Sequence, residues 1–194
     1  MRFGSDLDMV VFKTVPSYLQ VLGSMLGKKF AMEMITCYSL EDSLLLNSRI
    51  VWLAINTVLA RGRWPLIEGA SEHLSKISQV VEAPIVFISS RSEEWRQSTR
   101  DFLWKTFRLD FDLVLREKGG EFSKAEEIEK AGLDWFVEDC GETAVEVAEA
   151  LPKTQVCLFT YLWNEHIPCE RYPNLHRVNG WLEVWELVNE GKTS

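Results

Sequence analysis

Two carboxylates near the N-terminus are the first residues that could do chemistry. Asp6 and Asp8 lie two positions apart in the segment MRFGSDLDMVVF, where a strand expected at residues 2–7 ends. Side chains at positions i and i+2 of a strand share one face, so the two carboxylates can converge on one cation or one phosphoryl group. Like charges so close are unfavourable unless a cation or substrate compensates them. A solvated turn is the alternative interpretation of this short pattern.

Polar and charged residues also follow two further expected strands, at 85–88 and 135–137. A lysine begins an amphipathic segment that lies between these strands in the sequence. These residues are Ser89, Ser90 and Arg91 after the first strand, Glu138 and Asp139 after the second, and Lys124 at the start of KAEEIEKAG. Hydroxyl, cationic and acidic groups of these types bind phosphate and magnesium. Because ligands of open α/β sheets bind beyond the carboxyl ends of the strands, these ends are expected to form one site.

The elements that would position these residues follow from the apolar spacing. Strands are expected at 2–7, 85–88, 111–115, 135–137 and 155–160, and helices at 70–81, 93–107, 124–132, 142–151 and 181–188. Strands that alternate with helices predict a parallel sheet covered on both faces. Before them, helical spacing occurs at 15–26 and as one or two helices over 39–59, where Ser39 followed by Asp42 is a helix-start signal. Only the last few residues are expected to be disordered.

In the order and spacing of these segments the chain resembles the haloacid dehalogenase-like (HAD) phosphohydrolases. The four motifs of that superfamily correspond here to SDLDMV, IVFISSR, the Lys124 segment and FVEDCGE. The chain is most similar to the 5'(3')-deoxyribonucleotidases and related nucleotidases, through IEGASEHL, ISSRS, AGLDWFVED, LFTYLWN and HRVNGWLEVWELV. The resemblance implies a three-layer α/β fold with a Rossmann-like parallel sheet. The core would comprise residues 1–13 and 65–194, and a small helical cap at 14–64 would be inserted after the first strand.

The resemblance also implies catalytic roles and a metal site. Asp6 would attack phosphorus and form an aspartyl-phosphate, while Asp8 would protonate the leaving oxygen and then take a proton from water. A neighbouring phosphoryl group would raise the pKa of Asp8 for that role. Asp139, with Glu138 beside it, would hold Mg²⁺ together with the Asp6 carboxylate and the Asp8 carbonyl oxygen.

The phosphate-binding residues follow from the same resemblance. The Ser89 hydroxyl and the backbone N–H of Ser90 would contact phosphate oxygens, and Lys124 would neutralise charge on the transferring group, with Lys118 as a rival. Arg91 would be an additional phosphate or nucleotide contact.

Each of these residue types also has a purely structural interpretation. Asp139 could be the N-cap of the following helix, Ser89 a turn residue, and Lys124 a solvated lysine. Trp52 and Trp64 lie in or beside the expected cap, where they could stack on a nucleobase or pack in the core.

Two positions depart from the family pattern. The family usually has glycine after the second aspartate and an apolar residue before the first, where this chain has Met9 and Ser5. Because glycine tolerates backbone conformations that a side chain penalises, Met9 is expected to reshape the loop beside Asp6 and to lower catalytic efficiency rather than to change the fold.

Composition bounds the class of protein. The 194 residues are 46% hydrophobic with a formal net charge of −8, which argues against a broad nucleic-acid-binding surface. The chain has no apolar run near the roughly 18 residues of a membrane span and no signal-peptide pattern. Its four cysteines lack the Cys-x-x-Cys spacing and are expected to be free thiols, so a cytoplasmic location is expected.

These observations predict a magnesium-dependent phosphomonoesterase that acts on a small phosphorylated substrate. A (deoxy)nucleoside monophosphate is the first candidate, and a sugar phosphate or a nucleic-acid 3'-phosphate is the alternative. A non-catalytic binding protein on the same fold is a further alternative, because fold alone does not fix function. A homodimer is left open.

Overall fold

Within residues 1–191, which are those that the computed structural model describes, six parallel strands form one sheet in the order β3-β2-β1-β4-β5-β6. The strands are β1 (Phe3–Ser5), β2 (Ile85–Ser92), β3 (Phe111–Arg116), β4 (Trp135–Glu138), β5 (Gln155–Phe159) and β6 (Leu175–Val178). The expected disorder of the last few residues concerns 192–194, which lie outside the described residues. The predicted parallel sheet is confirmed.

Strand β6 was not expected from the sequence. It has four residues, and only its two ends are buried, while His176 and Arg177 in its middle are partly exposed. Such a short edge strand carries no alternating or continuous apolar signal. Its pairing with β5, in which Cys157 lies opposite His176, is a tertiary interaction that the local sequence does not encode.

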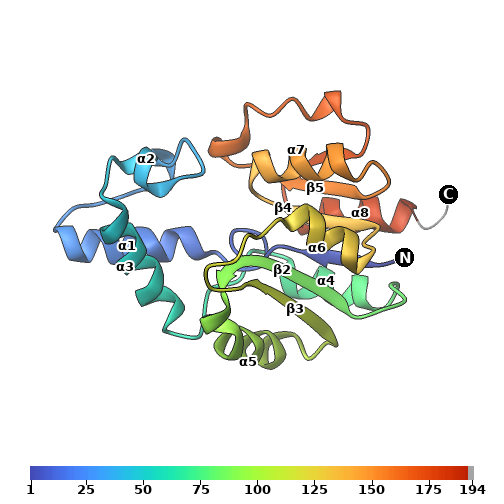
Figure 1. Cartoon of the computed structure of the whole chain (residues 1–194), viewed down its shortest axis with the longest axis horizontal. Coiled ribbons are helices and arrows are strands. Elements are labelled where there is room, and N and C mark those ends of the chain that lie inside the picture. Colours follow the sequence, from blue (N-terminus) through green and yellow to red (C-terminus); the bar gives the residue numbers. More distant parts are fainter. Residues whose placement is uncertain (192–194) are drawn as a thin grey trace.

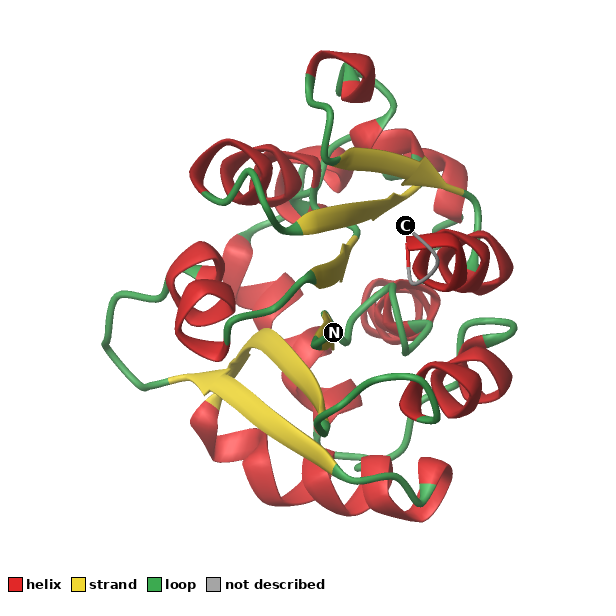
Figure 2. Cartoon of the chain, turned by 90° about the vertical axis from the view of Figure 1, so that its right-hand side faces the viewer, coloured by secondary structure: helices red, strands yellow, loops and turns green. Residues whose placement is uncertain are grey.

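Helices cover both faces of the sheet, as Figure 2 shows. They are α4 (Ala70–Ser78), α5 (Arg96–Phe107), α6 (Lys124–Ala131), α7 (Gly141–Ala150) and α8 (Trp181–Gly191). Helices α6 and α7 contact β2, β4 and β5 and each other, whereas α4 packs on α5 and α8 on the opposite side. The result is the expected three-layer α/β fold.

The alternation of side chains along β2 explains why both faces are covered. Ile85 and Phe87 belong to one buried cluster, and Val86 and Ile88 belong to the other. Successive strand side chains point to opposite faces, so a continuous apolar run is buried on both sides, as is typical of parallel sheets. The strand that leads to Ser89 is thereby packed between two apolar cores.

Three of the helices between the first two motifs lie to one side of the sheet (Figure 1). They are α1 (Thr14–Leu26), α2 (Leu40–Leu44) and α3 (Ser48–Leu59), and α1 packs on α3. Ser39 begins α2 as expected, because its hydroxyl accepts a hydrogen bond from the backbone N–H of Asp42 at 3.1 Å. Leu45 adopts a left-handed conformation with φ of 50°, so the 39–59 segment forms two helices rather than one.

The chain leaves and re-enters the sheet region at adjacent points. The backbone N–H of Lys13 donates to the Pro65 carbonyl at 2.8 Å, and that of Ile67 donates to the Val11 carbonyl at 2.9 Å. The segment that contains α1, α2 and α3 is therefore joined to the rest of the fold through two connecting segments that lie side by side.

Short 3₁₀ turns complete the fold: η1 (Met32–Met34), η2 (Glu93–Trp95), η3 (Leu162–Asn164) and η4 (Cys169–Arg171). The helix expected at 93–107 therefore begins as the turn η2 before α5. The four cysteines are free thiols. Among residues 1–191, no helix combines the length and the apolar character needed to cross a bilayer.

Candidate active site

The sheet order places the ends of β1 and β4 side by side. Ser5 lies opposite Val137 in the register, and the backbone N–H of Asp6 donates to the Val137 carbonyl at 2.9 Å. The pairing thus continues one residue past β1 and brings Asp6 next to Glu138 and Asp139. This is the point where the strand order reverses, which is where open α/β sheets bind ligands.

A buried group of three carboxylates forms there. Oxygens of Asp6, Glu138 and Asp139 lie within 4.8 Å of one another. The Lys124 ammonium is 2.9 Å from Oδ1 of Asp6 and 2.7 Å from Oε2 of Glu138. Lys124 is therefore a buried partner of the acidic group and not a solvated lysine. When all are ionised, three carboxylates against this one ammonium leave the cluster with two uncompensated negative charges, which suits a divalent cation.

The pKa values of two of the carboxyls reflect that imbalance. Burial raises the pKa of Asp6 to about 7 despite the opposing charge of Lys124, and the negative charges of Glu138 and Asp8 act in the same direction as burial. Burial, followed by the charges of Glu138 and Asp6, raises the pKa of Asp139 well above its usual range. Both carboxylates would be ionised more readily if a cation neutralised the cluster.

Asp139 has the features of a cation ligand. Within residues 1–191 its buried Oδ1 has no hydrogen-bond partner, although buried polar atoms are normally paired. Its carbonyl oxygen accepts from the indole N–H of Trp163 at 3.1 Å and from the amide of Asn164 at 2.7 Å. The N-cap of α7 is Cys140, so the N-cap interpretation of Asp139 is wrong.

Glu138 is engaged differently from Asp139. Its Oε2 accepts from Lys124, and its Oε1 accepts from the backbone N–H groups of Asp139 and Cys140 at 3.0 and 3.1 Å. These contacts hold the lysine in place and organise the turn into α7. Asp139 consequently offers the freer oxygen of the pair.

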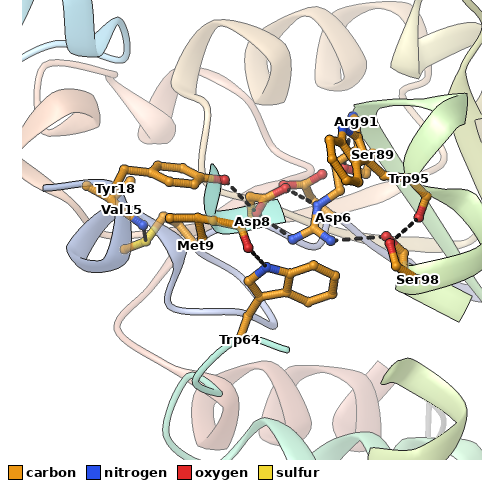
Figure 3. Close-up of polar contacts among 12 residues, drawn as sticks. Asp6, Asp8, Met9, Val15, Tyr18, Trp64, Ser89, Arg91, Trp95 and Ser98 are labelled. Atoms are coloured by element: carbon orange, nitrogen blue, oxygen red, sulfur yellow. Dashed lines mark hydrogen bonds and ion pairs between the residues drawn. The ribbon is translucent and has the colours of Figure 1, made fainter. Parts of the chain in front are cut away.

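The Asp8 carboxylate binds Arg91 and not Lys124, the partner of the acidic cluster. Its Oδ2 accepts from Nε of Arg91 and its Oδ1 from Nη2 of Arg91, both at 2.8 Å, and the Tyr18 hydroxyl lies 3.4 Å from Oδ1 (Figure 3). Burial would raise the pKa of Asp8, but the Arg91 guanidinium outweighs it and holds that pKa below its usual range. A neighbouring phosphoryl group was expected to raise the pKa of Asp8. In the structure that pKa is lowered instead, because the positive charge in direct contact with Asp8 is Arg91.

Trp64 does not have the exposure that base stacking requires. Only 3% of its surface is accessible, its ring packs on Phe12 and Phe102, and its indole N–H donates to the Val58 carbonyl at 3.1 Å. The expectation that Trp64 could stack on a nucleobase is wrong, since a buried ring cannot receive a ligand. Trp52, in contrast, is 63% exposed.

The predicted catalytic and phosphate-binding residues line one pocket of about 500 Å³: Asp6, Asp8, Ser89, Ser90, Arg91 and Lys124. Ser89 is buried, and its oxygen accepts from the backbone N–H of Arg91 at 3.3 Å. Lys118, the rival lysine, is exposed and does not line this pocket. The structure thus brings the strand ends together as the sequence predicts.

The opposite wall of the pocket comes from the segment between the first two motifs, and most of it was missed by sequence reasoning. It comprises Tyr18, Tyr38, Ser39, Leu40, Glu41, Trp52, Ile55, Asn56 and Leu59. The four members from α3 have the spacing i, i+3, i+4 and i+7, which marks one face of a helix. That spacing was available as a signal, but it cannot distinguish a pocket wall from a core face.

Met9 takes the left-handed backbone conformation, with φ of 58°, that glycine adopts without penalty. Its side chain is 3% exposed, and its carbonyl oxygen accepts from the Tyr161 hydroxyl at 2.8 Å. The loop therefore accommodates Met9 with strain, and a distant tyrosine holds it in place. Ser5 is also buried, and its hydroxyl donates to the Asp6 carbonyl at 2.7 Å.

Comparison with known proteins gives relatives by sequence and by structure. No family model matches the chain. "Putative nucleotidase BH1399" of Halalkalibacterium halodurans is 27% identical over 197 residues, covering 97% of this chain and 93% of that protein.

Three solved structures share the fold. The haloacid dehalogenase-like hydrolase SP0104 of Streptococcus pneumoniae has a TM-score of 0.64 at 14% identity, covering 96% of this chain and 97% of that one. The "predicted phosphoglycolate phosphatase" of Haemophilus somnus has a TM-score of 0.68 at 13% identity, with 96% of both chains covered. The HAD-hydrolase YfnB of Bacillus subtilis, described as bound to magnesium, has a TM-score of 0.61 at 11% identity, with 97% and 100% covered.

These structural neighbours are HAD-superfamily hydrolases, and the coverage is nearly complete in both directions. The six-stranded parallel sheet with its two layers of helices is therefore the Rossmann-like α/β fold of the HAD hydrolases, as the sequence motifs predicted.

Proposed function

We propose that this chain is a magnesium-dependent phosphomonoesterase that works through an aspartyl-phosphate on Asp6. The observation that carries the proposal is the pairing of Asp6 with the buried Lys124 in a pocket, next to a carboxylate of Asp139 whose Oδ1 has no protein partner in the described residues. In this proposal residues 1–13 and 65–194 form the catalytic core. Residues 14–64 form a cap that supplies the opposite pocket wall.

The reaction would proceed in two balanced steps. In the first, an Asp6 oxygen attacks phosphorus, the bond from phosphorus to the leaving oxygen breaks, and Asp8 gives that oxygen its proton. In the second, water attacks phosphorus and gives a proton to Asp8, and the bond between phosphorus and Asp6 breaks. Inorganic phosphate leaves, and the proton on Asp8 serves the next turnover. The negative phosphoryl group would raise the pKa of Asp8 against the effect of Arg91.

The donor set fits a hard divalent cation. Mg²⁺ prefers carboxylate and carbonyl oxygens and keeps several waters, and we assign Asp6, Asp139 and the Asp8 carbonyl oxygen to it, with Glu138 as the neighbour that holds Lys124. When bound, the ion would neutralise the acidic cluster and draw charge from the phosphoryl oxygens.

The phosphate contacts follow from the pocket lining. The Ser89 oxygen already accepts a backbone hydrogen bond, which leaves its O–H free to donate to a phosphate oxygen. Ser90 would donate its backbone N–H, and Lys124 would balance the charge of the transferring group.

A nucleoside monophosphate is the substrate that we favour. The relative of H. halodurans is named a nucleotidase, and the exposed Trp52 on the pocket wall offers a ring face on which a base could stack. A sugar phosphate lacks the flat group that would use this face. A nucleic-acid 3'-phosphate would need a basic track for the polymer, which the net charge of −8 argues against.

Release of phosphate from a substrate panel tests the proposal. The panel contains 5'- and 3'-nucleoside monophosphates, sugar phosphates and a 3'-phosphorylated oligonucleotide, each with Mg²⁺ and with chelator. We expect nucleotides to be hydrolysed in Mg²⁺ only, and Asp6→Asn to be inactive but folded. Absence of turnover on every compound would favour the non-catalytic binding protein, and preference for a sugar phosphate would overturn the substrate assignment.

A further inference from the structure

Arg91 was expected to contact phosphate, but its guanidinium is committed to the protein. Two of its nitrogens donate to Asp8 at 2.8 Å, and Nη1 donates to the Thr99 hydroxyl at 3.2 Å. Its Cζ lies 4.1 Å from the centre of the Trp64 ring and 5.2 Å from that of Phe12. The guanidinium is thus held by hydrogen bonds from its nitrogens and by contact with two neighbouring aromatic rings.

The exposure of the two partners shows which of them faces the pocket. The Arg91 side chain is 2% exposed, whereas the Asp8 side chain is 27% exposed. Asp8 is therefore the partner that is more open to the pocket, and the Tyr18 hydroxyl from α1 contacts the same carboxylate, as Figure 3 shows. A substrate would meet Asp8 before it could meet Arg91.

We propose that Arg91 is a positioning residue for Asp8 and not a ligand of the substrate phosphate. This inference rests on the proposed function, because it concerns the residue that moves the proton there. A guanidinium binds both oxygens of a carboxylate in one plane, so it fixes the direction in which Asp8 faces the reacting oxygens. A lysine would keep the charge but not the plane.

The test is the Arg91→Lys variant, which separates orientation from phosphate binding. A displacement of about 1 Å in a catalytic group costs on the order of 100-fold in rate. We therefore expect kcat to fall by about 30- to 100-fold, while the inhibition constant for inorganic phosphate stays within about twofold of wild type. The matched control is Arg100→Lys on α5, where the arginine is exposed and lies over Phe111, and it should leave both parameters unchanged.

A phosphate ligand would give the reverse pattern. If Arg91→Lys raised the inhibition constant for phosphate about tenfold or more with kcat preserved, the positioning role would be overturned. Unchanged kcat would overturn it as well. An Arg91→Gly variant adds a direct readout: millimolar guanidinium should restore part of its kcat, and the absence of rescue in a folded variant counts against the proposal.

A second variant covers the case in which Arg91 substitutions fail to fold. Thr99→Val preserves shape and removes the acceptor behind Nη1, so kcat should drop several-fold without a change in phosphate inhibition. An unchanged kcat there would contradict the inference. Wild-type protein that hydrolyses no substrate would overturn the proposed function together with this inference. This inference alone would be overturned if wild type were active and Asp6→Asn inactive while Arg91→Lys kept the kcat of wild type.

Discussion

Asp139→Asn should make the metal-free protein more stable while removing its response to magnesium. The Asp139 carboxylate is buried beside two other acidic side chains, and its Oδ1 lacks a partner within residues 1–191. An uncompensated buried charge costs several kcal/mol, and a neutral amide with an unpaired atom costs about 1–3 kcal/mol. The variant should therefore gain about 2 kcal/mol in free energy of unfolding at pH 8, which is about 4–8 °C in Tm for a chain of this size.

The gain should depend on pH with a definite sign. The pKa of Asp139 in the folded protein is raised above its value in the unfolded chain, so the folded state binds the proton more tightly. The penalty on wild type then grows as pH rises from the unfolded pKa through the folded one. The advantage of Asp139→Asn in chelator should be smaller at pH 5 than at pH 8.

Thermal unfolding of wild type and variant, in chelator and in millimolar Mg²⁺, measures both effects. Asp112→Asn is the matched control, because Asp112 is exposed on β3 and its change should alter neither Tm nor the magnesium response. A variant that is less stable than wild type in chelator at pH 8 would refute the reasoning. So would a variant that magnesium stabilises as strongly as it does wild type.

Four further substitutions test other parts of the site. Lys124→Met should destabilise the fold by about 3–5 kcal/mol, because it leaves buried carboxylates uncompensated; a loss below about 1 kcal/mol in chemical denaturation would show that those groups are already neutral. Met9→Gly should relieve about 1 kcal/mol of left-handed strain but lose about 2–3 kcal/mol of side-chain burial, so a higher Tm than wild type would contradict the packing described for Met9. Trp52→Ala should raise KM for a nucleotide about tenfold with little change in Tm, whereas Trp64→Ala should cost about 3–5 kcal/mol of stability. Equal effects of the two tryptophan changes on KM would show that exposure does not decide their roles.

The candidate site residues that the sequence brings together most directly are those that follow the apolar runs of parallel strands. Asp6, Ser89 and Asp139 each follow a short apolar run, and the carboxyl ends of parallel strands meet at one edge of the sheet. Lys124 begins the amphipathic segment KAEEIEKAG, and in the structure this segment is α6, capped by the Ser123 hydroxyl, which accepts from the backbone N–H of Glu126 at 3.3 Å. Local patterns were sufficient to place this part of the site.

The features that the sequence did not reveal depend on contacts between distant segments. Arg91 and Asp8 are 83 positions apart, and only the sheet register brings their side chains together. Trp52 and Trp64 are both aromatic residues in or beside the expected cap, but the packing of α3 exposes the first while the second is enclosed by Phe12 and Phe102. The local spacing of apolar residues predicts neither this contact nor this difference in exposure.

Identification of the phosphorylated residue tests the central claim most directly. Wild-type protein is mixed with its best phosphate ester in Mg²⁺, quenched in acid during turnover, digested and analysed by mass spectrometry. The proposed mechanism predicts one added phosphoryl group on the peptide that contains Asp6, and none in Asp6→Asn. Turnover without a phosphorylated Asp6, or a phosphoryl group on another side chain, would contradict it.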